Sequence, residues 1–420
     1  MNFMTRSGRS CAVLFAGLVA AAGCDSLLMV DIPGSVFEED LYDPGFATTL
    51  ATSAESEMEC AFRAQVANDA VWAGEMGASG GGRDIDVWAH RQQFSIIFGA
   101  VNGCNTLTAH WTPLQIARAA GERSASIIGG FATADVPNKD FLIGKSLISA
   151  AYAYVYLGES YCQVAFDGGP AVSRDSTFRV AVDRFTRGMA GVSTVTSTEA
   201  TNLMNLARVG RARAFLNLGD AAGVVADASL VPSTFVRNTF TATSPARLNA
   251  PIVNQNTLAP GGSQTVSRYY RNMTVGGVAD PRVVATFIGN VQGQDKLAPY
   301  WVQRKYTGLN APWRMASYRE ARLMLAEVQP ANSVAIINSL RAAYPTLPLF
   351  ASTDPTAIRD QVREERRREL WLEGFRTGDK LRWNEPWATG VSEHGSTFGT
   401  YTCMPIPEAE YLNNENIPDN

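Results

Sequence analysis

The sequence predicts a mainly α-helical fold with one loop-rich, irregular region that holds a few short strands. Apolar residues recur every three to four positions in several long segments, which is the pattern of helices with one buried face. Between those segments, residues 230–299 are rich in Thr, Ser, Asn, Gly and Pro and contain only short apolar runs. With 420 residues, 46% of them hydrophobic, the chain can bury one large core or two.

Residues 1–23 have the features of a bacterial lipoprotein signal peptide. Arg6 and Arg9 precede an apolar stretch, and small residues lead up to Cys24. Cleavage there would leave Cys24 as a lipidated N-terminus and residues 24–45 as an extended tether. Ordinary secretion, with Cys24 as a simple thiol, is the alternative. No later segment reaches the roughly 20 apolar residues of a transmembrane helix, so we expect the lipid to be the only membrane anchor.

The remaining cysteines are Cys60, Cys104, Cys162 and Cys403. An even number without a C-x-x-C pair, in an oxidising compartment, favours two disulfides over zinc or redox chemistry. Four cysteines allow three pairings. Among them we favour Cys60 with Cys104 and Cys162 with Cys403.

The charge pattern argues against nucleic acid as a partner, since the net charge is −4 and no purely basic block stands out. His90, His110 and His394 are solitary and lack metal-ligand spacing. Gly144-Lys145-Ser146 ends like a phosphate-binding loop but lacks the first glycine and a preceding strand. We therefore expect no metal, no cofactor and no nucleic acid.

Helical periodicity predicts a scaffold of packed helix pairs in the first half of the chain. Small residues in the Leu203–Leu218 segment allow close packing, and Gly219-Asp220 would turn the chain into a partner helix, as in tetratricopeptide repeats. Ordinary helical hairpins are the alternative, because no 34-residue period recurs. The expected helices are Phe46–Ala67, His90–Ile128 with a capped start near Asn105 and an interruption at Gly129 and Gly130, Phe141–Tyr156, Thr177–Met189, Leu203–Leu218 and Ala221–Ala228.

A further helix should begin at Asp354, a good N-cap followed by Pro355, and end at Gly374. On it, Glu365, Glu369 and Glu373 would fall on one face, where like charges repel unless cations meet them.

The nearby cations predict a structural ion-pair seam between this helix and others, with a catalytic carboxylate cluster as the alternative. Besides the three glutamates, the seam would include Arg366, Arg376, Asp379 and Arg382, met by Arg319 and Arg322 from the helical segment Tyr318–Glu327.

Aromatic side chains beside polar ones predict two candidate ligand sites. Aromatic rings offer apolar faces to sugars, and Arg or Asp can bind hydroxyl groups. Packing of the same rings in the core is the alternative. The first candidate set is Trp72, Arg83, Asp84 and Trp88 in a glycine-rich loop, and the second is Trp301, Tyr306 and Trp313 after the loop-rich region.

The C-terminal motifs resemble those of the SusD/RagB lipoproteins. They are Glu365-Arg366, Glu369-Leu370, Glu373-Gly374-Phe375-Arg376 and Asp379 with Arg382-Trp383. Weaker matches are Asp280-Pro281-Arg282, Lys305-Tyr306, Tyr318–Glu327, where Arg319 replaces a small residue, and Met404–Glu410. The resemblance is strongest at the N-terminal signal and after Ser317. It does not help with the disulfide pairing, because the family has no fixed plan.

The resemblance implies a SusD-like fold over residues 46–420. Residues 46–228 would form the helical scaffold, 229–312 the loop-rich, ligand-side region, and 313–420 the C-terminal helices and closing segment. It also implies ligand contacts from regions comparable to the two aromatic sets. The protein would be an outer-membrane lipoprotein facing the cell exterior.

The implied function is capture of a nutrient oligomer, a glycan or a peptide, and its delivery to a SusC-like TonB-dependent transporter without any catalysis. A helical-repeat envelope scaffold that binds only proteins is one alternative. A secreted hydrolase is another, although stacked acids beside arginines do not form the facing carboxyl pair that glycoside hydrolysis needs.

Overall fold

The computed structural model describes residues 38–80, 82–92, 103–104, 109–258 and 261–417. The chain from Pro44 to Asn420 forms one compact unit, and Met1–Asp43 forms another. The expected signal peptide, the lipidation site Cys24 and most of the tether lie outside the described residues. The following description concerns the unit that begins at Pro44.

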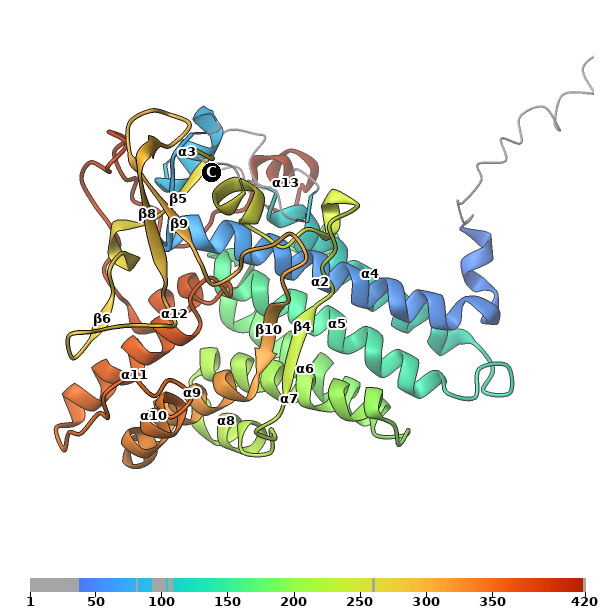
Figure 1. Cartoon of the computed structure of the whole chain (residues 1–420). Helices are drawn as coiled ribbons and strands as arrows, with labels where there is room; N and C mark the ends of the chain where they lie inside the picture. The colour runs from blue at the N-terminus through green and yellow to red at the C-terminus, as the bar shows by residue number, and fades with distance from the viewer. Residues whose placement is uncertain (1–37, 81, 93–102, 105–108, 259–260, 418–420) are drawn as a thin grey trace, which may run out of the picture. The chain divides into compact units, whose positions relative to one another are not determined.

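The first half of this unit is a stack of helices, as predicted (Figure 1). Consecutive long helices pack side by side, and Ser173, Ser197 and Asp220 each cap a helix by accepting a hydrogen bond from a backbone N–H of its first turn. The helices are α2 (Ala47–Trp72), α3 (Arg83–Ala89), α4 (Trp111–Gly130), α5 (Lys139–Ser160), α6 (Arg174–Val192), α7 (Thr198–Leu218) and α8 (Ala221–Ala228).

Two helix boundaries differ from the sequence prediction in a way that matters for the site. Helix α2 continues five residues beyond Ala67 to Trp72, because its last turns are buried on all sides and pack against other helices. Trp72 therefore ends a helix and does not begin a loop. Helix α4 begins at Trp111, well after His90, and it continues through Gly129 and Gly130 before it ends. The expected start near Asn105 lies outside the described residues.

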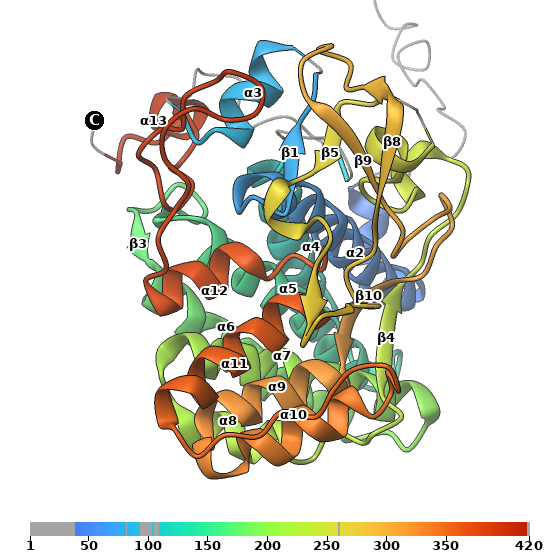
Figure 2. The same cartoon turned by 60° about the vertical axis from the view of Figure 1, so that its left-hand side comes forward.

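The loop-rich region is confirmed, and it lies at one end of the helical stack (Figure 2). Its strands pair antiparallel in two-stranded sheets, including β1 (Met76–Ala78) with β5 (Gln264–Val266) and β8 (Ala285–Gln292) with β9 (Pro299–Gln303). Strand β1 thereby joins the chain after α2 to the loop-rich region. The other pairs are β2 (Gln163–Val164) with β3 (Val172–Ser173), β4 (Val236–Thr239) with β10 (Trp313–Ser317), and β6 (Thr274–Val275) with β7 (Val278–Ala279).

The C-terminal part returns to helix: α9 (Tyr318–Val328), α10 (Ser333–Arg341), α11 (Pro355–Glu369), α12 (Arg376–Trp383) and α13 (Glu408–Asn413). Helices α9, α10 and α11 pack against one another at the end of the stack opposite the β1–β5 and β8–β9 sheets (Figure 2).

Helix α11, which carries the first part of the charged C-terminal segment, begins where the sequence predicts and ends earlier than expected. Asp354 caps α11 through a hydrogen bond from the Thr356 N–H, and Pro355 occupies its first turn. The helix ends at Glu369, not at Gly374. Leu372 and Gly374 both adopt positive φ angles, +59° and +75°, which turn the chain out of the helix. The expected stack of three glutamates on one helix is therefore wrong for Glu373.

Both favoured disulfides are present: Cys60–Cys104 and Cys162–Cys403. The second joins positions 241 residues apart and ties the chain after α5 to the C-terminal segment. Backbone hydrogen bonds flank this bridge, since Cys162 N–H donates to the Met404 carbonyl and Met404 N–H donates to the Ser160 carbonyl.

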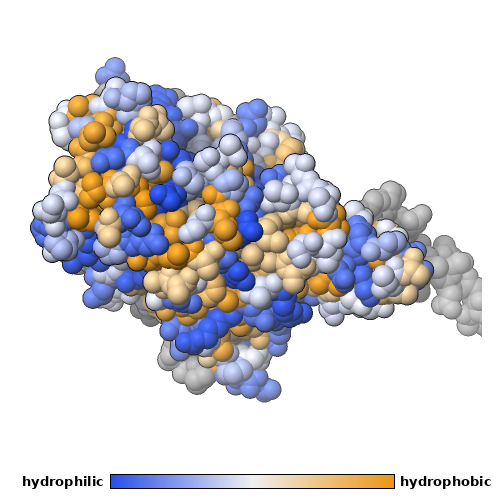
Figure 3. Space-filling view, turned by 90° about the horizontal axis from the view of Figure 1, so that it is seen from below, coloured by the Kyte–Doolittle hydropathy of each residue, from blue (hydrophilic) through white to orange (hydrophobic). Residues whose placement is uncertain are grey.

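Contrary to the sequence expectation, the described part of the chain holds one helix that is long and apolar enough to cross a membrane. This helix is α5, but 94% of its apolar window is buried inside the protein unit, where it contacts α4, α6 and α2. On the face drawn in Figure 3, apolar residues are interrupted by polar ones and do not merge into one continuous apolar surface.

Candidate functional site

The acidic side chains of the C-terminal motif are buried and held by cations. The Glu369 carboxylate accepts hydrogen bonds from Arg319, at 2.8 Å, and from Arg314. The Glu373 carboxylate lies 2.7 Å from Arg314 and 2.7 Å from Lys305. Although Glu373 has left the helix, Arg314 joins it to Glu369. The two glutamates thus share one cationic neighbourhood.

Two further acids complete this buried network. Glu365 pairs with Arg282 and Arg341. Asp379 pairs with Arg366, at 3.0 Å, and with Arg382, at 2.8 Å. The network therefore joins α11 and α12 to α9, α10 and the loop-rich region.

Several cations of the network differ from those expected. Arg319 meets Glu369 as anticipated, whereas Arg322 stacks on Tyr318 and Arg376 pairs with Glu385. The sequence reasoning missed Arg282, Lys305, Arg314 and Arg341 as partners of the glutamates. Arg282 and Lys305 stood in motifs that resemble the family's, but nothing in their local pattern indicated which acids they would meet.

The ion pairs shift the pKa values of the buried acids. Burial alone raises the pKa of Asp379, but Arg366 and Arg382 outweigh it and lower that pKa to about 2. Burial likewise opposes ionisation of Glu369, and Arg319 and Arg314 bring its pKa below the usual value. Both carboxylates are therefore charged at neutral pH, as acceptors locked by arginines. This arrangement stabilises packing and leaves neither acid free to carry a proton.

In the second aromatic set, Trp313 and Tyr306 lie in the core, whereas Trp301 is partly exposed. Trp313 is fully buried and Tyr306 nearly so. Their rings stack with centroids 3.6 Å apart, and the Trp313 indole N–H donates to the Leu372 carbonyl at 2.7 Å. They pack beside the buried ion pairs. Trp301 lies apart from them, half-buried on β9, with its ring 5.2 Å from that of Phe287.

One member of the first aromatic set, Trp72, borders a pocket with an almost fully buried side chain. Trp72 lines it from the end of α2 and packs against Trp88, with ring centroids 5.2 Å apart. Trp88 is buried behind Trp72. Arg83, Asp84 and Trp88 lie in helix α3, so the expectation that they belong to a glycine-rich loop is wrong. Their role in ligand binding, like that of the other predicted residues, stays a prediction.

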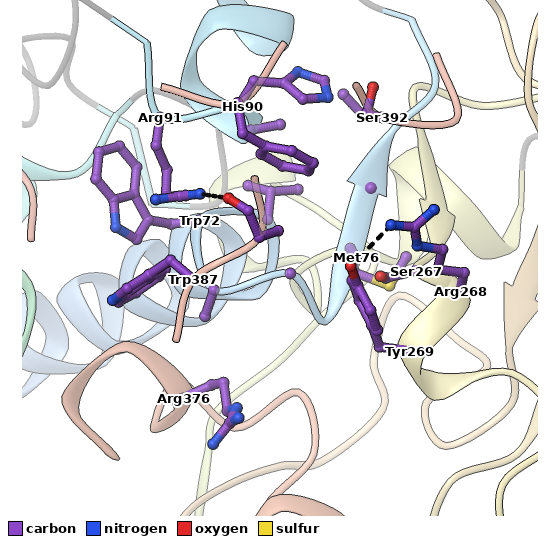
Figure 4. A pocket seen from close by; sticks show the side chains of 18 of the residues that line it. Trp72, Met76, His90, Arg91, Ser267, Arg268, Tyr269, Arg376, Trp387 and Ser392 are labelled. Carbon is purple, nitrogen blue, oxygen red and sulfur yellow. Dashed lines mark hydrogen bonds between the residues drawn. The ribbon is translucent and has the colours of Figure 1, made fainter. Parts of the chain in front are cut away.

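The pocket has a volume of about 410 Å³ and is built from segments far apart in the sequence (Figure 4). The end of α2 and strand β1 supply one part of the wall, and η6 (Arg268–Tyr270) faces it. Helix α12 and the segment between Glu385 and Phe398 close the remaining sides. Its size lies within the range of ligand sites in proteins, about 300–1,000 Å³.

Aromatic and hydrogen-bonding groups meet in this pocket. Trp387 and Arg91 lie together on one side in Figure 4, and Tyr269 and Arg268 lie on the other. Tyr269 is 48% exposed. The Arg91 guanidinium and the Lys380 ammonium lie 5.0 and 4.7 Å from the Trp387 ring centroid. Such cation–π contacts hold the indole in place.

Sequence reasoning did not select Trp387, Tyr269 or Arg268. Trp387 follows a proline in the segment after α12, and Tyr269 lies among polar residues of the loop-rich region. An exposed aromatic residue within a polar segment is a usable signal, but only the fold brings these two together with Trp72. Trp301 is related to the pocket through Arg271, which lies 5.5 Å from its ring and forms a bidentate ion pair with Glu393 on the pocket wall.

The structure also brings together two histidines that the sequence separates by about 300 residues. His90 and His394 both line the pocket, with ring centroids 6.4 Å apart. Each ring is fixed by a carboxylate: His90 by Asp86 at 3.0 Å and His394 by Asp295 at 2.6 Å. Burial lowers the pKa of His90. Among the described residues, no group of three or more His, Cys, Asp or Glu is arranged to hold a metal ion.

Comparison with known proteins agrees with the C-terminal motifs. Residues 318–420 match the sequence model of the SusD family. No curated protein matches the sequence.

Solved structures match nearly the whole chain. A SusD-like carbohydrate binding protein from Bacteroides vulgatus superposes with a TM-score of 0.65 at 14% identity, covering 89% of this chain and 97% of its own. A SusD superfamily protein from Parabacteroides distasonis superposes with a TM-score of 0.66 at 12% identity, covering 92% of this chain and 99% of its own. Surface glycan-binding protein A from Bacteroides fluxus superposes with a TM-score of 0.62 at 13% identity, covering 87% of this chain and 95% of its own.

The fold is therefore SusD-like. The described chain has the fold of these proteins, and residues 318–420 carry the family's sequence pattern. The resemblance that the C-terminal motifs indicate is confirmed, and so is the mainly helical fold class.

Proposed function

We propose that the protein binds a nutrient glycan at the cell surface through this pocket, where Tyr269 and Trp387 offer accessible aromatic rings and Trp72 is a buried part of the wall. The observation that supports this most directly is the joining of aromatic faces with hydrogen-bonding side chains in one cavity of a SusD-like fold. Sugar rings present C–H faces that pack on indole and phenol rings, and hydroxyl groups that accept from arginine and lysine.

We further propose that Cys24 carries a lipid that anchors the protein to the outer membrane, facing outward, and that the bound glycan passes to a SusC-like TonB-dependent transporter. The family resemblance and the N-terminal sequence support this. Replacing Cys24 by Ala should release the protein from the membrane fraction. Affinity capture of the native lipoprotein should recover a TonB-dependent barrel, and its absence would contradict the delivery step.

In this function the protein does no chemistry. Both carboxylates on the pocket wall are engaged by arginines, Glu385 by Arg376 and Glu393 by Arg271. A glycoside hydrolase needs one carboxyl group that donates a proton and a second that acts as base or nucleophile. Incubation with glycans should therefore yield binding and no cleavage products.

The binding proposal is tested with the variant Trp387→Ala on a glycan array and by calorimetry with the glycans that bind. Loss of one stacking ring should weaken binding by about 5- to 30-fold, because truncation of an aromatic anchor in a binding site costs about 1–2 kcal/mol. Phe240→Ala is the matched control, since Phe240 is an exposed aromatic residue away from this pocket. If the wild-type protein binds no glycan, or if both variants bind equally well, the pocket is not the glycan site.

A further inference from the structure

We infer that the pocket selects acidic oligosaccharides, in which the sugar carries a carboxylate or a sulfate. This inference rests on the proposed glycan-binding function and specifies its ligand class. It comes from the distribution of charge on the pocket wall and from the partners of each charged group.

Cations outnumber carboxylates on this wall. Among the described residues, five Arg or Lys side chains line the pocket, against two carboxylates, Glu385 and Glu393. Each carboxylate already has a close arginine partner: Arg376 for Glu385, and Arg271 for Glu393 through two hydrogen bonds of 2.8 and 2.9 Å. The five cations are Arg91, Arg268, Arg367, Arg376 and Lys380.

Three of these cations have no carboxylate of their own within the described part of the chain. Arg91 donates hydrogen bonds to the backbone carbonyls of Tyr401 and Ala388. Arg268 donates to the Tyr269 hydroxyl at 3.0 Å. Lys380 donates to the Pro386 carbonyl at 2.7 Å, and its nearest carboxylate, Glu385, lies 3.9 Å away and is shared with Arg376.

The other acids near this wall have partners of their own among the described residues. Asp86 is engaged by His90 and by the Ser396 hydroxyl, and Asp295 is engaged by His394. Glu364 pairs with Arg367. Glu75 is buried between the lining residues Gly74 and Met76, where it accepts a hydrogen bond from the Leu372 N–H and burial raises its pKa well above the usual value.

The three cations differ in position, and so in what they can do. Arg268 is exposed at the rim, where its guanidinium can donate directly to a ligand. Arg91 and Lys380 are buried against Trp387 and act through their charge in a region with little water. Because charges interact more strongly where water is excluded, an anionic sugar stacked on Trp387 would be attracted by both.

The ionisation of Lys380 fits a wall of positive potential. Burial, the largest cause, and the neighbouring charges of Arg376, Arg91 and Arg367 together lower its pKa to about 8. Glu385 opposes this effect. An anion bound in the pocket would raise the pKa of Lys380 and so keep its side chain charged.

The test compares acidic glycans with neutral counterparts of the same length. Oligogalacturonate, a hyaluronan oligosaccharide and sialyllactose would each be measured by calorimetry beside its carboxyl-reduced form, and a sulfated chondroitin oligosaccharide beside its desulfated form. For at least one pair the acidic member should bind about tenfold tighter at low salt, and the difference should shrink as salt rises. The reduced and desulfated arms distinguish a carboxylate from a sulfate.

Arg268→Gln provides the sharper test, because this exposed side chain has little role in folding. It should weaken binding of the acidic member about fivefold and leave the neutral member unchanged. Arg304→Gln, an exposed arginine outside the pocket, is the matched control and should change neither. Lys380→Met, followed by thermal melting, should act in the same direction as Arg268→Gln.

The outcomes separate this inference from the function on which it rests. Equal binding of acidic and neutral members, or an equal loss of both in Arg268→Gln, overturns the inference and leaves glycan binding standing. Failure to bind any glycan, with or without binding of an acidic peptide such as oligoglutamate, overturns both.

Discussion

Glu369 illustrates how a single buried carboxylate can hold several segments together. It accepts from Arg314 on β10 and from Arg319 on α9 while it ends α11 itself. A buried ion pair adds little over a well-packed apolar contact, but removal of one partner leaves the other charge unpaired in a region without water. The function of such a residue is therefore best tested through stability.

We expect Glu369→Ala to lower the free energy of unfolding by about 3–5 kcal/mol, because Arg314 and Arg319 lose a carboxylate. Urea unfolding measures the change. Glu408→Ala is the control, since Glu408 is exposed and its loss should change stability by less than about 0.5 kcal/mol. Unchanged stability together with lost glycan binding would show that Glu369 belongs to the binding site instead.

Glu320 behaves in the opposite way to the paired acids. It lies fully buried at the start of α9, and burial raises its pKa to about 8, although Arg213 and Arg366 partly oppose this. The folded protein therefore keeps this proton up to about pH 8, whereas the unfolded chain loses it near pH 4.5. Stability contributed by this group is present below pH 4.5 and is lost as pH rises to 8.

We expect Glu320→Gln to remove this pH dependence. As pH rises from 4.5 to 8, the unfolding free energy of the wild type should fall relative to that of the variant by on the order of 4 kcal/mol. Urea unfolding of both proteins at several pH values measures the difference. Parallel pH profiles for the two proteins would mean that Glu320 ionises alike in the folded and unfolded states.

At the scale of elements, helices α5 and α6 approach so closely that only glycine fits between them. A Cβ atom on Gly144 would lie 2.6 Å from the Gly188 carbonyl oxygen and 2.8 Å from the Val192 nitrogen. Gly188 and Gly191 on α6 are equally crowded by α5. The small residues therefore set the distance between two central helices of the scaffold.

We expect Gly144→Ala to cost about 1–3 kcal/mol of stability, because the crowding atoms belong to the backbone of α6 and the two helices must move apart. Urea unfolding measures this cost. Gly130→Ala, at the end of α4, has no heavy atom within 4 Å of the added methyl group and should be neutral or slightly stabilising. Similar behaviour of the two variants would contradict the close-packing argument.

At the scale of the whole unit, the long-range disulfide fixes the C-terminal segment that completes the pocket. Cys403 follows the Glu385–Phe398 wall and is tied to Cys162 just after α5. Closing a loop of 241 residues removes much of the freedom of the unfolded chain. The shorter bridge, Cys60–Cys104, spans 44 residues.

We expect the double variant Cys162→Ala/Cys403→Ala to lose about 5 kcal/mol of stability, and Cys60→Ala/Cys104→Ala about 4 kcal/mol, from loop-closure entropy. Urea unfolding of the two double variants under the same conditions compares them. The order of the two losses is the critical result. A larger loss for the shorter loop would show that native contacts around Cys60, and not chain entropy, decide the cost.

The sequence predicted the helical elements well, because helix signals are local. The Asp354-Pro355 start and the Gly219-Asp220 turn were visible in a few adjacent residues, and the structure confirms both. The end of α11 was predicted wrongly. Gly374 is a strong stop signal, but the helix ends earlier. The apolar side chains after Glu369 are buried in the core: Leu370, Trp371 and Leu372.

The sequence by itself determined the fold class, the SusD-like C-terminal pattern and an acidic stretch that required cationic partners, because periodicity, capping and repulsion between nearby charges act over a few residues. Only the tertiary structure decided which cations meet those acids and which aromatic rings share a pocket. Arg282 reaches Glu365 across 83 residues, and Trp387 joins the wall that includes Trp72 across more than 300. Such partners are chosen by the packing of distant segments, which no local pattern records.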